Sequence, residues 1–297
     1  MIYSFFDYAD RSAAEAGAPF QDFAYIRDMC GEAESCAAGC LPPGEGGVRP
    51  RNLALCVAPR HYKTTFLSRL FPAWCLAELA PDCEFILTSY SEELAADSAM
   101  AIRRQISQPW HRALYPHLEV SREAALRRHY FRTTAGGAVY AAPMGGALTG
   151  FGAGRSRRGF GGAIIIDDPL KAVHAQSPAL RRRAAEYYNS ALKSRRNSAD
   201  NTPIILVMQR LHPDDLIGWI LKNEPEDWRV VCYPALRGGR PLNPMTTSLQ
   251  FLEKLRRVAP QIYWAQYMQS PTVQGGNLIK LHWWKTYKTL GQADKTE

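Results

Sequence analysis

Several features that would place a chain in a particular class are missing from this sequence of 297 residues. No apolar run approaches the roughly 20 residues that a membrane span needs. The first ten residues carry Asp7 and Asp10, where a secretory signal would carry lysine or arginine. There is no internal repeat. Because 46% of the residues are hydrophobic, the chain can bury a substantial core, and we expect a soluble, cytoplasmic protein with one large domain and an appendage.

The cysteines do not form the pattern of a disulfide framework. They number seven, and Cys56 and Cys83 lie inside apolar runs. Cys30, Cys36 and Cys40 cluster, but their spacing is not a paired-ligand pattern and no histidine lies nearby. We therefore expect most cysteines to be buried thiols and do not expect a zinc site.

The charge of the chain is unevenly distributed. The net charge is +8, yet the first 50 residues hold eight acids against three bases. Ten arginines and only two acids lie between Arg103 and Arg158. A second basic cluster consists of Arg181, Arg182, Arg183, Lys193, Arg195 and Arg196. This excess favours a polyanionic partner, although arginine on a helix also serves simply to keep a surface solvated, and composition alone does not identify DNA.

Short apolar runs alternate with helical patterns along the middle of the chain. Predicted strands cover residues 53–58, 84–88, 163–167, 203–208 and 228–232. Predicted helices cover 92–108 and 177–195, the second with Ser177 as N-cap and Pro178 at the first helical position. This alternation is typical of a parallel α/β sheet. Residues 129–134 and 138–142 flank Ala-Gly-Gly and predict a hairpin inserted into that order.

Composition divides the chain into three predicted parts. An N-terminal helical segment ends in a loop rich in glycine and proline over 38–52, and the α/β core follows. The last part is a linker or subdomain, helical over 248–268, with turn-rich connectors at 237–247 and 272–277. The predicted boundaries are 1–50, 51–235 and 236–297.

The first predicted strand leads into a candidate phosphate-binding loop and the start of a helix. Backbone N–H groups at a helix start favour an anion, Lys63 would reach the β- and γ-phosphates of ATP, and the Thr64 hydroxyl would ligate Mg²⁺. Neither expected glycine is present: Ala58 stands at the first position and Tyr62 directly before the lysine. Taken alone the loop is therefore a weak signal. The predicted nucleotide-binding residues of this loop are Pro59, Arg60, His61, Tyr62, Lys63, Thr64 and Thr65.

A second motif strengthens this interpretation. The predicted strand at 163–167 ends in Asp167 and Asp168, and Pro169 stops it. In a phosphate-loop ATPase the first acid holds the Mg²⁺ shell and the next acid orients and activates the attacking water. We therefore predict Thr64 and Asp167 as metal ligands and Asp168 as a catalytic acid. The alternative is that the two acids only cap a surface turn.

Phosphoryl transfer also requires positive charge around the γ-phosphate. The candidates are Arg60, inside the loop, and Arg158, in the glycine-rich stretch 150–162 before the acidic strand. An arginine finger acts within its own subunit or across to a neighbour, and the sequence does not decide which. Either arginine could instead bind DNA.

Four segments, in this order along the chain, resemble the large terminase subunits of tailed phages and prophages. Ala-Pro-Arg-His-Tyr-Lys-Thr (58–64) is similar to the family's Pro-Pro-Arg-His-Gly-Lys-Ser loop, including its unusual arginine. Leu-Thr-Ser-Tyr-Ser-Glu-Glu-Leu-Ala (87–95) resembles its second strand and the helix after it. Arg-Gly-Phe (158–160) before Ile-Ile-Ile-Asp-Asp-Pro (164–169) resembles its acidic strand. Val-Met-Gln-Arg-Leu-His-Pro-Asp-Asp-Leu (207–216) resembles its coupling motif, and the resemblance spans roughly residues 20–285.

This resemblance implies a fold, an activity and partners. The fold is a P-loop NTPase of the ASCE type, with a mainly parallel sheet flanked by helices. The activity is that of the N-terminal ATPase domain, which uses ATP and Mg²⁺ to move double-stranded DNA into a procapsid in the cytoplasm of the infected bacterial host. The implied partners are the portal protein, the small terminase subunit and further copies in a homo-oligomeric ring, with a monomer expected in isolation.

The resemblance also assigns roles to particular residues. In that family the coupling motif senses the γ-phosphate, and by position Met208, Gln209 and Arg210 carry this role, with Gln209 as the polar sensor. A side chain at the end of a neighbouring parallel strand would face the same crevice as the loop. Gln21, upstream of the loop, is the candidate for adenine recognition, or else a solvent-facing glutamine. We expect His212, Asp214 and Asp215 to cap the next helix.

Three departures from the family bear on function. Tyr62 in place of glycine predicts a stiffer loop or an altered nucleotide affinity, and Asp168 stands where many relatives use glutamate. The family's nuclease domain begins after the segment that residues 275–287 resemble, and only ten residues follow here, so we expect no nuclease activity. Two alternatives stay open: a degenerate domain that binds nucleotide and DNA with little hydrolysis, and an ATP-dependent helicase or remodeller of related fold.

Overall fold

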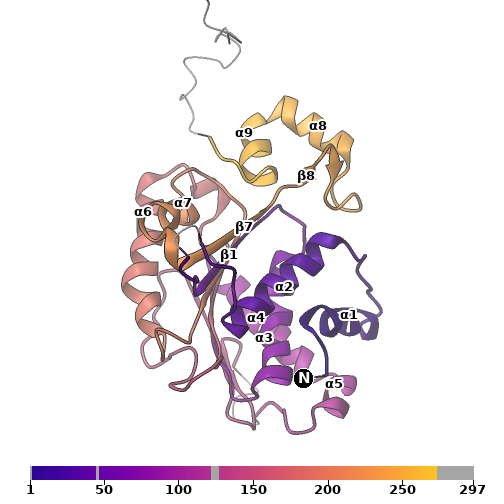
Figure 1. The fold of residues 1–297 in the computed structure, drawn as a ribbon, viewed down its shortest axis with the longest axis vertical. Helices are drawn as coiled ribbons and strands as arrows, with labels where there is room; N and C mark the ends of the chain where they lie inside the picture. The colour runs from indigo at the N-terminus through magenta and orange to yellow at the C-terminus, as the bar shows by residue number, and fades with distance from the viewer. Residues whose placement is uncertain (1, 45–46, 122–126, 273–297) are drawn as a thin grey trace, which may run out of the picture.

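A computed structural model describes residues 2–44, 47–121 and 127–272 of the chain, and its centre is a seven-stranded sheet (Figure 1). All neighbouring strands are parallel except β3 and β4, which form an antiparallel pair at one edge. The α/β fold, the five predicted strands and the inserted hairpin are thereby confirmed. In sheet order the strands are β3 (Tyr130–Arg132), β4 (Ala138–Pro143), β2 (Glu84–Ser89), β5 (Ile164–Asp167), β6 (Ile204–Met208), β1 (Asn52–Val57) and β7 (Trp228–Tyr233).

The central strands are apolar on both faces because each face is covered by helices. In β1, Leu53, Leu55 and Val57 join one core, whereas Ala54 and Cys56 join the other. The first face is covered by α1 (Phe5–Glu15), α2 (Ala24–Ala38), α4 (Glu92–Ile106), α5 (Pro109–Leu114) and one helical run formed by Thr64–Leu70, α3 (Phe71–Trp74) and Cys75–Leu79. The second face is covered by α6 (Pro178–Tyr187), its continuation through Tyr188–Leu192 and Lys193–Arg195, and α7 (Leu216–Asn223) (Figure 1).

Local signals in the sequence locate several helix ends correctly. Ser177 caps α6 by accepting a hydrogen bond from the backbone N–H of Leu180 (3.4 Å), and Pro178 opens the helix. The helix predicted over 92–108 ends at Ile106, and Pro109 begins α5. The segment between α2 and β1, rich in glycine and proline, has no helix or strand among its described residues. Single 3₁₀ turns lie at Ala172–His174 and Pro225–Asp227.

The N-terminal helices share their core with the sheet. The ring centroids of Phe5 in α1 and Trp74 in α3 lie 5.4 Å apart. From α2, Asp28 accepts a 2.8 Å hydrogen bond from the Tyr233 hydroxyl at the end of β7. The guanidinium of Arg229 in β7 pairs with Glu32 at 2.8 Å. Residues 5–38 therefore form part of the layer that covers the first face of the sheet.

The C-terminal helices form a small separate layer beyond the carboxyl ends of the strands (Figure 1). After the hairpin of β8 (Leu236–Arg237) and β9 (Arg240–Pro241) come α8 (Leu249–Val258), α9 (Pro260–Ile262) and the turn Tyr263–Tyr267. Leu252 and Tyr263 pack with Ala58 and Ala235 in this third core. The predicted helix over 248–268 is broken before Pro260, which lacks the N–H that a continuous helix needs. The connector predicted at 272–277 lies, after its first residue, outside the described residues.

The described residues contain no helix with the length and apolarity to cross a bilayer. The cysteines are free thiols, and only Cys40 and Cys232 are exposed, so the prediction of mostly buried thiols is confirmed. In the same part of the chain no three histidine, cysteine or acidic side chains form a group that could hold a metal.

Candidate nucleotide-binding and catalytic site

Three polar segments meet where β1, β6 and β5 end. These strands are parallel neighbours in the order β5, β6, β1, so their carboxyl ends lie along one edge of the sheet. The phosphate loop follows β1, the paired acids close β5, and Gln209 follows β6. In open parallel sheets this edge is where ligands bind.

The phosphate loop has a left-handed backbone although it has no glycine. Arg60 has φ 64° and Tyr62 has φ 61°, values that cost a residue with a side chain about 1–2 kcal/mol each. The Tyr62 ring packs edge-on against Phe66 at a centroid distance of 6.3 Å. His61 is fully buried and its Nδ1 donates to the Pro59 carbonyl at 2.8 Å. Side-chain packing beneath the loop thus offsets the conformational cost that glycine avoids.

Asp167 lies at the end of β5 between two hydroxyl groups. The Thr64 hydroxyl donates to Asp167 Oδ1 at 3.1 Å, and the Ser68 hydroxyl donates to Oδ2 at 2.8 Å. Burial and the adjacent Asp168 charge raise the pKa of Asp167, while Lys63 and the two hydroxyls partly oppose that rise. A carboxylate and hydroxyls supply the oxygen ligands that Mg²⁺ prefers, so these residues fit the predicted metal site.

Ser68 is a site residue that the sequence interpretation missed. It follows Thr64 by four residues, so the two side chains lie on the same face of a helical segment. The spacing Thr-x-x-x-Ser at the start of the helix was the available signal. Its hydroxyl is buried and is directed at Asp167, which makes it part of the candidate metal site.

Asp168 is held from several directions at once. Its Oδ2 lies 3.0 Å from Lys63 Nζ, and its Oδ1 accepts a hydrogen bond from the Gln209 backbone N–H at 3.3 Å. Its own N–H donates to Val207 O (2.9 Å), and its carbonyl accepts from the Tyr90 N–H (3.0 Å). Its φ of 45° is left-handed, which aspartate tolerates better than most residues. The structure therefore brings together the three motifs that are far apart in sequence.

The coupling segment divides into a residue whose backbone N–H contacts Asp168 and residues that hold the turn. Among the described residues, Gln209 Oε1 is buried and has no hydrogen-bond partner. Met208 packs in the second core. The guanidinium of Arg210 pairs with Asp215 at 3.0 Å and is buried there, and the sensing role that the resemblance gives to this segment stays a prediction. Asp215 caps α7 by accepting from Gly218 N at 3.0 Å, as expected.

The two candidate arginines lie in different places. Arg60 is exposed on the phosphate loop, and its charge partly offsets the rise that burial causes in the pKa of Tyr267 in the C-terminal layer. Arg158 is exposed in the segment that precedes β5. Its neighbour Arg157 pairs at 2.6 Å with Asp82, which lies just before β2. Arg158 thus lies near the amino ends of the parallel strands, whereas the phosphate loop follows the carboxyl end of β1. Its role as an arginine finger stays a prediction.

Gln21 is exposed on the segment that leads into α2. The residue before it, Phe20, lies against Phe66 of the helix after the phosphate loop, with ring centroids 5.0 Å apart. Tyr25 in turn lies 5.9 Å from the His61 ring. Gln21 is therefore next to the loop, as adenine recognition requires, and that role stays a prediction. Thr65 is exposed beside Thr64.

We predict that Asp167→Asn stabilises the metal-free protein while destroying the candidate metal site. Because the pKa of Asp167 is higher in the folded than in the unfolded chain, the folded state holds the extra proton at intermediate pH, and the free energy of unfolding falls as pH rises through that interval. The amide removes this loss. Melting temperatures in EDTA should therefore rise in the variant, and more at pH 8 than at pH 5. The exposed Asp227→Asn is the matched control; an Asp167→Asn shift no larger than that of the control contradicts the prediction.

Known proteins match this chain by structure and not by sequence. By sequence, no protein family and no curated protein matches the chain. By structure, the HK97 bacteriophage large terminase matches with a TM-score of 0.54 and 12% identity over 89% of this chain and 53% of that one. A mutant of the Thermus phage P74-26 large terminase ATPase domain matches with a TM-score of 0.55 and 10% identity, over 89% of this chain and 98% of that one.

The mainly parallel, helix-covered sheet of this chain belongs to the same α/β fold class as these structures. Within that class the fold is the one found in the ATPase domains of phage large terminases, which confirms the resemblance at the level of fold. The chain spans about half the length of the HK97 large terminase that it matches.

Proposed function

We propose that this chain is an ATP-hydrolysing motor domain of the large-terminase kind, which moves double-stranded DNA. The observation that carries the proposal is the junction of Lys63, Asp168 and Gln209, with Asp167 held between Thr64 and Ser68. Three segments more than 30 residues apart in sequence converge there at the ends of three adjacent parallel strands. Capping of a surface turn explains neither the burial of Asp167 nor its two hydroxyl partners.

Each residue of the site has a role in phosphoryl transfer. Lys63 pairs with Asp168, and a bound phosphate would compete with Asp168 for the lysine. Released from Lys63, Asp168 can orient the attacking water and accept its proton. Gln209, whose backbone N–H contacts Asp168 and whose Oε1 has no partner among the described residues, is the candidate to hold the same water. Thr64, Ser68 and Asp167 would hold Mg²⁺, which would supply positive charge against the negative charge that develops on the phosphates.

The larger assembly follows from the fold relationship and the charge of the chain. A net charge of +8 suits a polyanion, and a motor that moves any sequence must contact DNA mostly through its backbone. We infer assembly as a homo-oligomeric ring in the cytoplasm of an infected bacterium, with the portal protein and the small terminase subunit as partners. In such a ring Arg158 would reach a neighbouring site. We assign residues 51–235 to the ATPase core, 1–50 to its N-terminal cover, and 236–297 to a linking subdomain.

A nucleotide-binding domain with little hydrolysis is the second candidate. The left-handed Arg60 and Tyr62 favour it, because a loop fixed in this conformation by packing beneath it can hold phosphate tightly and adjust little during turnover. This candidate predicts ATP binding without multiple turnover.

ATP hydrolysis by the purified chain tests both candidates. We expect multiple turnovers in Mg²⁺, complete loss of turnover when EDTA removes the metal, and faster turnover when double-stranded DNA is added. EDTA-insensitive turnover would show that a contaminating or unrelated activity is being measured. Binding of ATP by calorimetry with no turnover, with or without DNA, would reject the motor and support the second candidate.

A further inference from the structure

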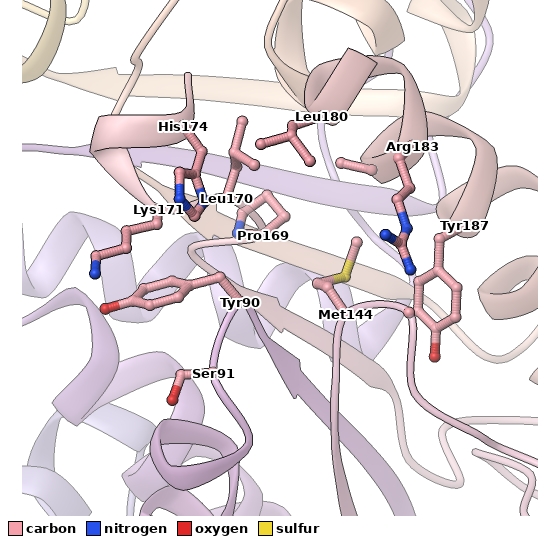
Figure 2. A pocket seen from close by; sticks show the side chains of 12 residues that line it. Tyr90, Ser91, Met144, Pro169, Leu170, Lys171, His174, Leu180, Arg183 and Tyr187 are labelled. Carbon is pink, nitrogen blue, oxygen red and sulfur yellow. The ribbon is translucent and has the colours of Figure 1, made fainter. Parts of the chain in front are cut away.

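A pocket of about 450 Å³ opens beside the candidate site, beyond the ends of β2, β4 and β5 (Figure 2). Its floor is made by Pro169 and Leu170, directly after the paired acids, together with Met144 after β4. Tyr90, after β2, forms one wall, and α6 forms the other. The pocket is therefore built from the same edge of the sheet as the nucleotide site, on the side away from the phosphate loop.

The pocket is cationic and has no acidic lining residue. Lys171 and His174 lie at one end and Arg183 at the other, with the apolar floor between them (Figure 2). All three are exposed, and no ion pair joins any of them to an acid of the described chain. By contrast, acids lie among the residues that line the pocket on the other side of α6. Positive charge at both ends of an uncharged floor is suited to an extended anion with an uncharged segment between its charges.

We propose that this pocket binds the sugar-phosphate backbone of duplex DNA, with Lys171 and Arg183 on successive phosphates and Pro169 and Leu170 beneath the sugar between them. The inference rests on the proposed motor function and gives it a DNA contact. A nucleic-acid strand presents one charge per nucleotide, about every 3.4 Å of helix axis, joined by uncharged sugar. Contacts of this kind carry no sequence information, as a motor that acts on any sequence requires.

The pocket shares its backbone with the catalytic acid. Pro169 is bonded to Asp168, and the N–H of Tyr90 donates to the Asp168 carbonyl at 3.0 Å. The floor and one wall of the pocket therefore adjoin the residue whose carboxylate pairs with Lys63. DNA bound in this pocket would contact the segment that holds Asp168, which gives DNA binding a direct route to the rate of hydrolysis.

The geometry of α6 also separates the three consecutive arginines. Neighbouring residues on a helix point about 100° apart, so Arg181, Arg182 and Arg183 cannot form one face. Arg181 is half-buried and donates to the Ala175 carbonyl at 2.6 Å. Arg182 lines the pocket on the other side of the helix, and Arg183 alone of the three lines the proposed DNA pocket. Arg182 is thus a matched control: it carries the same charge on the same helix, one residue away.

Fluorescence anisotropy with a labelled duplex of mixed sequence, in the absence of nucleotide, tests the pocket. We expect Arg183→Ala and Lys171→Ala each to weaken binding roughly five- to tenfold and to lower the slope of log K against log salt by about 1. Arg182→Ala should leave the slope unchanged, and Arg183→Lys should restore most of the affinity because it keeps the charge. Equal losses in Arg182→Ala and Arg183→Ala would show diffuse attraction and overturn the proposal.

Two further arms separate this proposal from the motor function. Inorganic phosphate should compete poorly with the labelled duplex when it is compared with an unlabelled duplex that carries the same concentration of phosphate groups. Equal competition would mean a small-anion site and reject DNA as the ligand.

In the ATPase assay, Arg183→Ala should lose stimulation by DNA, whereas Arg182→Ala should retain it. If the wild-type chain hydrolyses ATP but Arg183→Ala binds DNA normally, the pocket is wrong and the motor stands. If the wild-type chain has no turnover, the motor is wrong, and the anisotropy series still decides the pocket.

Discussion

Replacing Lys63 with alanine is expected to lower ATP turnover roughly 10²- to 10³-fold, the usual cost of removing one charged contact to the transition state. Lys63 Nζ lies 3.0 Å from Asp168 Oδ2, and the lysine charge also opposes the rise in the pKa of Asp167. Alanine would therefore remove the phosphate ligand and leave two adjacent carboxylates without their counter-charge. Steady-state kinetics over a range of Mg²⁺ concentrations, with circular dichroism to verify the fold, measures the effect.

Two companion variants make this prediction specific to the site. Lys63→Arg keeps the charge but not the compact ammonium, so it should recover Mg²⁺ affinity more than turnover. Asp168→Asn should keep ATP binding and lose kcat, because Asp168 would act on the water and Lys63 would bind the phosphate in both ground and transition states. Turnover in Lys63→Ala within a few-fold of the wild type would remove this loop from the mechanism.

Much of the sheet could be predicted because its strands are buried on both faces. The runs at β1, β5 and β6 are almost entirely apolar, and such runs between helical patterns have few structural alternatives. The acids at the end of β5 and the lysine after β1 could be placed together by the same argument, since parallel strands end at one edge. The boundary of α6 was equally accessible, because Ser177 and Pro178 specify a helix start by local chemistry.

The features that the sequence did not predict depend on three-dimensional contacts and backbone conformation, which separation along the chain does not reveal. Arg158 was a candidate because it lies near the acids in sequence. It precedes β5, however, whereas the acids close β5, so the two lie at opposite ends of that strand. Tyr62 was noted as a missing glycine, but the left-handed backbone and the packing on Phe66 appear only in three dimensions. Likewise, the contact between the Arg210 N–H and Gln269 Oε1 (2.9 Å) joins segments 59 residues apart.

The contact with Gln269 places the turn after β6 between the nucleotide site and the C-terminal layer. On one side, the Gln209 N–H donates to Asp168. On the other, the Arg210 N–H donates to Gln269 Oε1, in the segment that follows the C-terminal turn Tyr263–Tyr267. The contacts with Asp168 and with Gln269 therefore both depend on the conformation of this turn. Asp215 stabilises that conformation through its contacts with Arg210 and Leu211.

Replacing Asp215 with alanine is accordingly expected to cost about 3–5 kcal/mol of the free energy of unfolding, the range measured when one partner of a buried ion pair is removed. The Asp215 side chain is 2% exposed and accepts hydrogen bonds from the N–H groups of Leu211 (2.9 Å) and Gly218 (3.0 Å). It also pairs with Arg210 at 3.0 Å. Alanine leaves the buried arginine without its counter-charge and removes the N-cap of α7. Urea denaturation followed by circular dichroism measures the loss.

Asp214→Ala is the matched control for this prediction. Asp214 is adjacent in sequence and also forms an ion pair, with Lys222, but both side chains are more than half exposed. A surface pair contributes at most about 1 kcal/mol, so this variant should unfold near the wild-type midpoint. Equal losses in the two variants would mean that the turn is stabilised by net charge and not by the buried pair. A large loss confined to Asp215→Ala, with weakened DNA stimulation in whatever fraction stays folded, would establish the turn as the structural link between nucleotide site and C-terminal layer.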